Sequence, residues 1–193
     1  MDENEIIDEF RKCDALLEGH FILSSGLHST KYLQCALALS KPDLAKKLTN
    51  ELANKIKEQF FEKIDFVVAP AMGGLIIGHE IAMLLNLPFL FLERVEGEFK
   101  LRRGFTIQPN SNCLMIEDVV TTGLSSREAI KVVSDLGANV IGEAAIVNRS
   151  GGDVDLGIKL ISLLNLNIPT YEEDKIPVEL KNIPAEKPGS RSL

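Results

Sequence analysis

Two adjacent carboxylates and a hydroxyl-rich turn stand close together in the middle of the chain. Glu117 and Asp118 follow the apolar run 113–116, and the turn, residues 121–125, carries three hydroxyls and a glycine. Hydroxyls, a glycine that tolerates positive φ and the free N–H groups of a helix start suit a phosphate. The carboxylates would repel phosphate, but they can accept hydrogen bonds from a sugar diol or hold a hydrated Mg²⁺. The stretch therefore predicts a site with a phosphate end and a diol or cation end.

The turn contains no lysine, which departs from the phosphate-binding pattern GxxxxGK[ST]. This favours a terminal phosphomonoester over a nucleoside triphosphate. An acidic pair before a helix is also common as a plain solvated helix start. Two like charges about 4 Å apart cost about 1 kcal/mol in water and about 4 kcal/mol at an effective dielectric of 20, so a pair at the end of a buried strand needs donors or a cation. That cost, together with the adjoining turn, favours a binding site.

The elements that position this site follow from hydrophobic periodicity. The run 113–116 predicts a strand buried on both faces, and the helical pattern 127–136 follows the turn. Ligands of open α/β sheets bind outside the carboxyl ends of the strands. Further strands are predicted at 66–69, 88–92, 138–147 and 157–164, and further helices at 40–60 and 75–85. The order predicts an α/β fold with a mainly parallel, doubly wound sheet flanked by helices.

The two ends of the chain carry other patterns. An amphipathic helix is predicted over 3–17, closed by Gly19, and two strand-like segments around a Ser/Gly turn occupy 20–35. Ser40 is expected to cap the helix 40–60, with Pro42 in its first turn and Asp43 completing a capping box. After Asn167, four prolines predict an irregular tail.

Composition narrows the class of protein. The 193 residues carry a net charge of −7 without a basic run, which opposes nucleic-acid binding. The N-terminus is acidic, and no apolar run approaches the ~20 residues of a membrane span, so no membrane association and a cytoplasmic location are expected. Three widely spaced cysteines are expected to be reduced. His79-Glu80 fails the HExxH pattern because residue 83 is Met, so zinc is not expected.

Residues 113–125 resemble the phosphoribosyl-diphosphate (PRPP) signature of type I phosphoribosyltransferases. The resemblance implies that Glu117 and Asp118 bind the ribose hydroxyls, with Asp118 also counted as catalytic. It also implies that the loop wraps the 5′-phosphate, through Val119, Val120, Thr121, Thr122, Gly123, Leu124 and Ser125. The implied architecture is a single domain, 1–193, with a small N-terminal hood formed by about residues 1–40 and by the C-terminal tail.

Other stretches resemble orotate phosphoribosyltransferases. The segment 20–35 is similar to their hood, which implies that Ser25 and Tyr32 contact orotate, although Ser24 stands where many members carry a lysine. Ala71, Met72 and Gly73 match the loop that contacts pyrophosphate, where a common lysine is again missing. On its own, this glycine-rich loop is equally consistent with close packing of a helix on the sheet.

Residues 93–105 hold four bases among three acids. Taken alone they fit a solvated hairpin with alternating charges. The resemblance implies instead a mobile loop that closes over a neighbouring subunit's active site, in a homodimer with shared sites. Arg94 would then bind PRPP, and Lys100, Arg102 and Arg103 would be catalytic cations, although the family's usual Lys-x-His is absent.

Arg149 ends the predicted strand 138–147 beside Gly151 and Gly152, where it could fork onto a planar carboxylate or form a surface ion pair. The resemblance implies that Arg149 and Thr121 bind orotate. The implied reaction is orotate plus PRPP to orotidine 5′-monophosphate and pyrophosphate, a step of UMP synthesis. Mg²⁺ is the implied cofactor, held mainly through PRPP and water. A purine phosphoribosyltransferase and a non-catalytic PRPP-sensing regulator are the alternatives.

Overall fold

A six-stranded sheet forms the centre of the computed structural model, which describes residues 1–23 and 25–188. Its order is β5-β4-β3-β6-β7-β8, and only β5 at the edge runs antiparallel to its neighbour. The strands are β3 (Phe66–Pro70), β4 (Phe89–Val95), β5 (Glu98–Leu101), β6 (Asn112–Val120), β7 (Asn139–Asn148) and β8 (Lys159–Asn165). The predicted mainly parallel sheet is confirmed.

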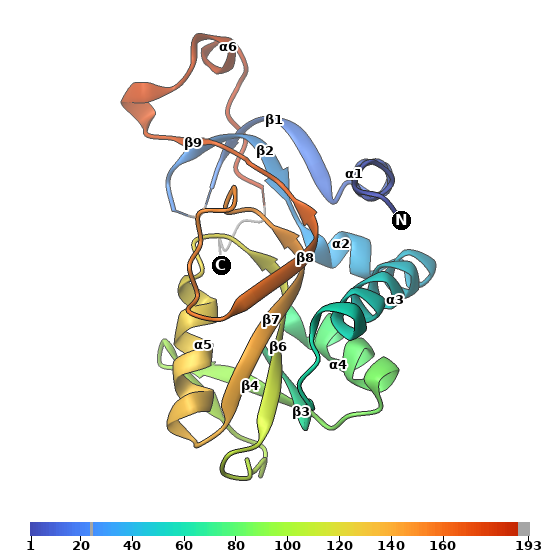
Figure 1. The fold of residues 1–193 in the computed structure, drawn as a ribbon. Helices are drawn as coiled ribbons and strands as arrows, with labels where there is room; N and C mark the ends of the chain where they lie inside the picture. Colours follow the sequence, from blue (N-terminus) through green and yellow to red (C-terminus); the bar gives the residue numbers. More distant parts are fainter. Residues whose placement is uncertain (24, 189–193) are drawn as a thin grey trace.

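Helices cover both faces of this sheet (Figure 1). α3 (Pro42–Gln59) and α4 (Gly74–Leu85) lie on one face, and α5 (Leu124–Asp135) lies on the other. Alternate residues of β6 serve the two sides: Leu114 and Ile116 belong to the core under α3 and α4, whereas Met115 packs with Ala129 of α5. The double covering explains why residues 113–116 of this strand form an uninterrupted apolar run.

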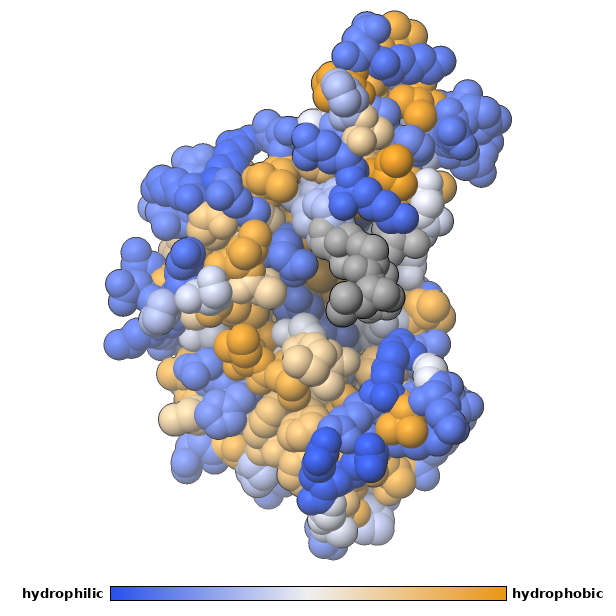
Figure 2. Space-filling model, turned by 180° about the vertical axis from the view of Figure 1, so that it is seen from behind, coloured by the Kyte–Doolittle hydropathy of each residue, from blue (hydrophilic) through white to orange (hydrophobic). Residues whose placement is uncertain are grey.

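A second, three-stranded sheet forms the hood, in the order β1-β2-β9. Its elements are α1 (Glu3–Lys12), β1 (Leu16–Ile22), β2 (His28–Leu33), α2 (Cys35–Leu39) and β9 (Thr170–Tyr171), followed by a 3-10 turn (Glu173–Lys175) and α6 (Val178–Lys181). The tail was expected to be irregular, but β9 pairs with β2, and the N–H of Ile22 donates to the carbonyl of Glu186 at 2.8 Å. The segment with α6 projects from the top of the molecule and is mostly hydrophilic (Figures 1 and 2).

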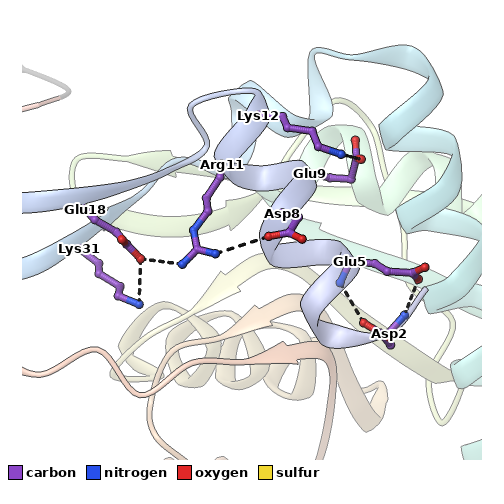
Figure 3. A network of polar contacts seen from close by, with 8 residues as sticks. All are labelled: Asp2, Glu5, Asp8, Glu9, Arg11, Lys12, Glu18 and Lys31. Carbon is purple, nitrogen blue, oxygen red and sulfur yellow. Dashed lines mark hydrogen bonds and ion pairs between the residues drawn. The ribbon is translucent and has the colours of Figure 1, made fainter.

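The prediction of one helix over 3–17 is wrong at its end. α1 stops at Lys12, Asp14 adopts φ 57, and Leu16 already pairs with Leu33 of β2. Gly19 therefore lies inside β1 and caps no helix. Ion pairs from Glu18 of β1 to Arg11 of α1 (2.9 Å) and to Lys31 of β2 (3.3 Å) join the helix to the hairpin (Figure 3).

The expected capping box at Ser40 is also wrong. α3 begins with Pro42 at its first turn, but its N-cap is Lys41 and has no side-chain cap. Ser40 ends α2, where its hydroxyl donates to the carbonyl of Leu37 at 2.7 Å. The box is found at α1 instead, between Asp2 and Glu5 (Figure 3).

Two boundaries near the carboxylates differ from expectation. β6 continues to Val120, so Glu117 and Asp118 lie within the strand and not beyond it, and α5 already begins at Leu124. Residues 89–101 form the β4–β5 hairpin, which matches the local alternative to a loop. Among the described residues, no helix combines the length and apolar character needed to cross a bilayer.

Candidate active site

A cavity of about 900 Å³, here called the main cavity, opens at the carboxyl ends of β3 and β6. Its lining contains every residue predicted to bind PRPP. From one side come Ala71, Met72, Gly73 and Arg94, and from the other come residues 117–125. The structure therefore brings together segments that are more than twenty residues apart in sequence.

The phosphate-type turn is held in one conformation. Gly123 has φ 71, and a Cβ at this position would lie 2.4 Å from Val154, so only glycine fits. Arg127 donates to the carbonyls of Thr122 at 2.8 Å and Asp155 at 3.1 Å. The first N–H groups of α5 follow directly and have no intrahelical acceptor, as at any helix start. The turn can thus present backbone donors to an anion.

The two carboxylates lie in a weakly solvated environment. Glu117 is 7% exposed, and burial raises its pKa to about 9, with Asp118 and Glu143 acting in the same direction. Burial also raises the pKa of Asp118, although its Oδ1 accepts a hydrogen bond from the N–H of Val119 at 2.9 Å. Hydroxyl donors or a cation in the cavity would favour the charged forms.

The loop 71–73 approaches the acids directly. A Cβ added to Gly73 would lie 2.5 Å from Oδ1 of Asp118, and one added to Gly74 would lie 2.9 Å from the carbonyl oxygen of Ile116. Real side chains do not tolerate such distances. The two glycines therefore let the end of β3 and the start of α4 close against β6, which forms one wall of the main cavity.

Arg94 lies at the rim of the cavity beside the turn. One Nη donates to the carbonyl of Gly97, the other donates to Glu128 at 2.6 Å and reaches the hydroxyl of Ser125 at 3.4 Å. Its guanidinium also lies 4.0 Å from the ring centroid of Phe99. A cation fixed in this way next to backbone donors can contribute to anion binding.

The other predicted cations do not line the main cavity. Arg103 donates to Glu93 through Nε at 3.0 Å and Nη2 at 2.6 Å, and Arg102 lies 3.4 Å from the second oxygen of the same carboxylate. Lys100 faces Glu98 at 3.9 Å. In this conformation the hairpin's bases are paired internally.

A smaller side cavity of about 360 Å³ shares Thr121 and Thr122 with the main cavity. Arg149 lines it, and burial lowers the pKa of that guanidinium. Among the described residues, no carboxylate pairs with Arg149. Ser25 and Tyr32, also predicted to bind orotate, line neither cavity; Tyr32 packs near Phe21, with ring centroids 6.0 Å apart. Ser24 lies outside the described residues.

Sequence reasoning missed part of the main cavity. Its wall also contains Gln34, Ala36, Leu39, Ile76, Phe99 and Ser126. The first three come from α2 and its N-cap, a helix that the pattern did not predict. Their sequence carries no chemical signal, because only the folding of the hood linker onto β6 brings them to the site.

Comparison with known proteins shows which family the chain belongs to. Residues 38–184 match the family described as phosphoribosyl transferase domain. The orotate phosphoribosyltransferase of Erythrobacter litoralis is 52% identical over 192 residues, which cover 100% of both chains. The chain belongs to the orotate phosphoribosyltransferase family. Another member of this family, from Novosphingobium aromaticivorans, is 54% identical over 190 residues, 98% of each chain.

A solved structure of the same family has the same fold. Orotate phosphoribosyltransferase from Aeropyrum pernix superimposes with a TM-score of 0.69 at 25% identity, over 83% of this chain and 93% of that one. The expected type I phosphoribosyltransferase fold is therefore confirmed.

Proposed function

We propose that this protein transfers the 5-phosphoribosyl group from PRPP to orotate, giving orotidine 5′-monophosphate and pyrophosphate. The observation that carries the proposal is the adjacency of two cavities. Thr121 and Thr122 belong to both, so a base held by Arg149 in the side cavity would lie next to a ribose held by Glu117 and Asp118. The full-length relatives named orotate phosphoribosyltransferase support the same reaction.

In this proposal PRPP occupies the main cavity. Residues 121–125 bind its 5′-phosphate, because backbone and hydroxyl donors converge there. Glu117 and Asp118 accept hydrogen bonds from the ribose hydroxyls. The loop 71–73 and Arg94 face the pyrophosphate. A helix dipole contributes about 0.3–1 kcal/mol, whereas micromolar binding requires about 8 kcal/mol, so several segments must act together.

Mg²⁺ fits the site as a companion of the substrate. Glu117 and Asp118 offer the oxygen ligands that Mg²⁺ prefers. A bound cation would also stabilise the charged carboxylates and so offset the effect of burial, which raises both pKa values. The described residues contain no group of three or more potential ligands, so these acids would complete a shell made mostly of PRPP oxygens and water. When bound, the ion neutralises charge on the leaving pyrophosphate.

Orotate is proposed to bind in the side cavity. Arg149 can donate two parallel hydrogen bonds to its carboxylate, and Thr121 can contact the ring from the shared wall. Ser25 and Tyr32 belong to the hood, from which they are proposed to cover the base. Because Ser25 and Tyr32 line neither cavity, this part of the proposal requires movement of the hood.

The chemistry needs positioning and charge stabilisation, and no covalent nucleophile. As the bond to pyrophosphate breaks, the ribose gains oxocarbenium character, and exclusion of water protects it. Lys100, Arg102 and Arg103 are proposed to stabilise the leaving charge after exchanging their internal carboxylates for pyrophosphate. Their position outside the main cavity accords with a homodimer in which each hairpin serves the partner's site.

Two further features accord with the proposal. One concerns the homodimer, and the other concerns a cytoplasmic location, which we also propose. Outside the main cavity, the large apolar side chains of Leu37 on α2 and of Met83 and Leu84 on α4 are exposed. Figure 2 shows apolar surface on the body of the molecule. Such a surface suits a second copy of the chain. All three cysteines are free thiols, as a reducing compartment favours.

The test is pyrophosphate release from PRPP in the presence of Mg²⁺ with orotate, adenine or guanine as acceptor. Release with orotate alone is expected. Release with a purine instead would favour a purine phosphoribosyltransferase. PRPP binding without release for any base would favour the regulator. Asp118→Asn in the same assay controls for a contaminating activity.

A further inference from the structure

Glu143 is a carboxyl group in the middle of the central sheet that the proposed reaction does not use. It lies in β7 between apolar neighbours, and it is 0% exposed. Its register partner in β6 is Met115, and it faces α5. Burial of a carboxyl group is costly unless specific bonds compensate for lost water. The contacts of this side chain therefore indicate what it does.

The carboxyl makes one hydrogen bond, and that bond goes to α5. The hydroxyl of Ser126, itself 2% exposed, donates to Oε1 of Glu143 at 2.8 Å. The other oxygen, Oε2, is buried and has no hydrogen-bond partner among the described residues. Burial raises the pKa of Glu143 to about 7, while the bond from Ser126 acts against this shift. Of the surrounding ionisable groups, Glu117 on β6 feels the charge of Glu143.

Ser126 is the third residue of α5, directly after the turn that lines the main cavity. The N-cap of this helix is Gly123, which offers no side-chain cap. The outer side of the turn is held by Arg127, through the carbonyls of Thr122 and Asp155. The inner side is held by the bond between Ser126 and Glu143. Two tethers, one buried and one exposed, therefore fix the direction in which the first N–H groups of α5 point.

We propose that Glu143 is a positioning residue for PRPP, which acts through Ser126 to aim the first N–H groups of α5 at the 5′-phosphate. This inference rests on the proposed function and extends it. Hydrogen-bond donors bind an anion well only when their direction is fixed before binding. Glu143 would thus set the affinity for PRPP without touching it.

If the pair between Ser126 and Glu143 served stability alone, its removal would leave KM for PRPP unchanged. When both partners of a buried hydrogen bond are replaced by apolar groups of similar size, stability changes little or increases. The double variant Ser126→Ala/Glu143→Met makes that replacement. It removes the inner tether and also removes the unpaired oxygen of Glu143. In this variant the affinity for PRPP should therefore fall, while the free energy of unfolding should stay level or increase.

The experiment measures KM for PRPP, KM for orotate, kcat and the urea midpoint of unfolding. In the double variant, KM for PRPP should rise about tenfold, the value for loss of one buried hydrogen bond, while KM for orotate stays within about twofold. The urea midpoint should not fall. Glu143→Gln retains an acceptor for Ser126, so its KM for PRPP should stay within about threefold. Ser134→Ala, an exposed serine of the same helix, is the matched control and should behave as the unmodified chain.

An unchanged KM for PRPP in the double variant would overturn the inference, as would equal rises of both KM values. A direct titration separates this inference from the proposed function. If the unmodified chain released no pyrophosphate with orotate, calorimetry with ribose 5-phosphate would still decide. Binding about tenfold weaker to the double variant than to the unmodified chain supports the inference, and equal binding rejects it.

Discussion

Gly73 lies so close to Asp118 that a Cβ at position 73 would stand 2.5 Å from Oδ1 and 2.8 Å from Cγ of the carboxylate. This contact joins the loop after β3 to the end of β6. It places a backbone segment proposed to face pyrophosphate directly beside an acid proposed to bind ribose. Only a residue without a side chain allows both to occupy the same cavity wall.

Gly73→Ala should therefore damage the site more than the fold. The added methyl must push Asp118 or the loop by about 1 Å to reach an ordinary contact distance, and misplacement of that order costs about 100-fold in kcat/KM. Steady-state kinetics and a urea unfolding curve measure the two effects. Gly19→Ala in the hood is the control, because its Cβ meets only the tip of Phe21, at 3.3 Å. Equal activity of the two variants would contradict the assigned contact.

Asp118→Asn should lower kcat/KM by about 10- to 100-fold, the effect of losing hydrogen bonds to a charged acceptor. The fold should remain, since the substitution removes a charge whose burial is unfavourable, as the raised pKa of Asp118 indicates. Circular dichroism and urea unfolding provide the check on structure. Turnover equal to that of the unmodified chain would remove the diol-binding role.

Stability should fall as pH rises, and Glu117 should cause much of the change. Its pKa is about 9 in the folded chain against an ordinary value of 4.5, so between these values the folded chain holds a proton that the unfolded chain has lost. The contribution is complete below pH 4.5 and is lost as pH rises towards 9, at up to about 1.4 kcal/mol per pH unit. Glu143 acts in the same direction up to about pH 7.

Urea unfolding at pH 5, 6, 7 and 8 measures this dependence. Glu117→Gln removes the titrating group and keeps its size, so the free energy of unfolding should decline less steeply with pH in this variant. Parallel declines in the two proteins would show that the carboxyl group of Glu117 titrates normally.

The strands and the phosphate turn could be predicted from the sequence because their signals are local. Residues 66–69 and 113–116 are apolar on both faces, which a doubly covered parallel strand requires. The helix predicted over 3–17 was too long because Leu16 and Leu17 fit a helical stripe as well as a strand. Only their pairing with β2 decides between the two. The capping box predicted at Ser40 was wrong because the hydroxyl of Ser40 donates to a carbonyl at the end of α2 and does not cap α3.

The lining of the main cavity was predictable where one continuous segment builds it. Glu117, Asp118 and residues 121–125 needed no tertiary information. Gln34 and its neighbours reach the cavity only through the fold of the hood. Glu143 did leave a signal that was overlooked, namely a carboxylate inside the apolar run 138–147. The internal pairing of Arg102 and Arg103 with Glu93 could not be foreseen, because charge spacing alone does not choose between partners.

Arg149→Ala should affect orotate far more than PRPP. Loss of a forked arginine should raise KM for orotate about 100-fold, whereas KM for PRPP should stay within about threefold. Arg149→Lys keeps the charge without the fork and should fall between the two. Initial rates with each substrate varied in turn give both constants. Equal losses for orotate and PRPP would contradict a role confined to the base.

Mixing two impaired variants tests whether active sites are shared between subunits. One variant carries Arg102→Ala/Arg103→Ala and the other carries Asp118→Asn. If each hairpin serves the partner's site, half of the dimers are mixed and each has one intact site, so about a quarter of full activity should return. No recovery after verified subunit exchange would reject sharing.

The central claim is that the acidic end of β6 and the turn before α5 hold opposite ends of one phosphorylated ribose. A crystal structure of the protein with PRPP and Mg²⁺ tests it most directly. The account predicts the 5′-phosphate on the N–H groups at the start of α5 and the ribose hydroxyls on Glu117 and Asp118. PRPP bound elsewhere, with the main cavity empty, would contradict it.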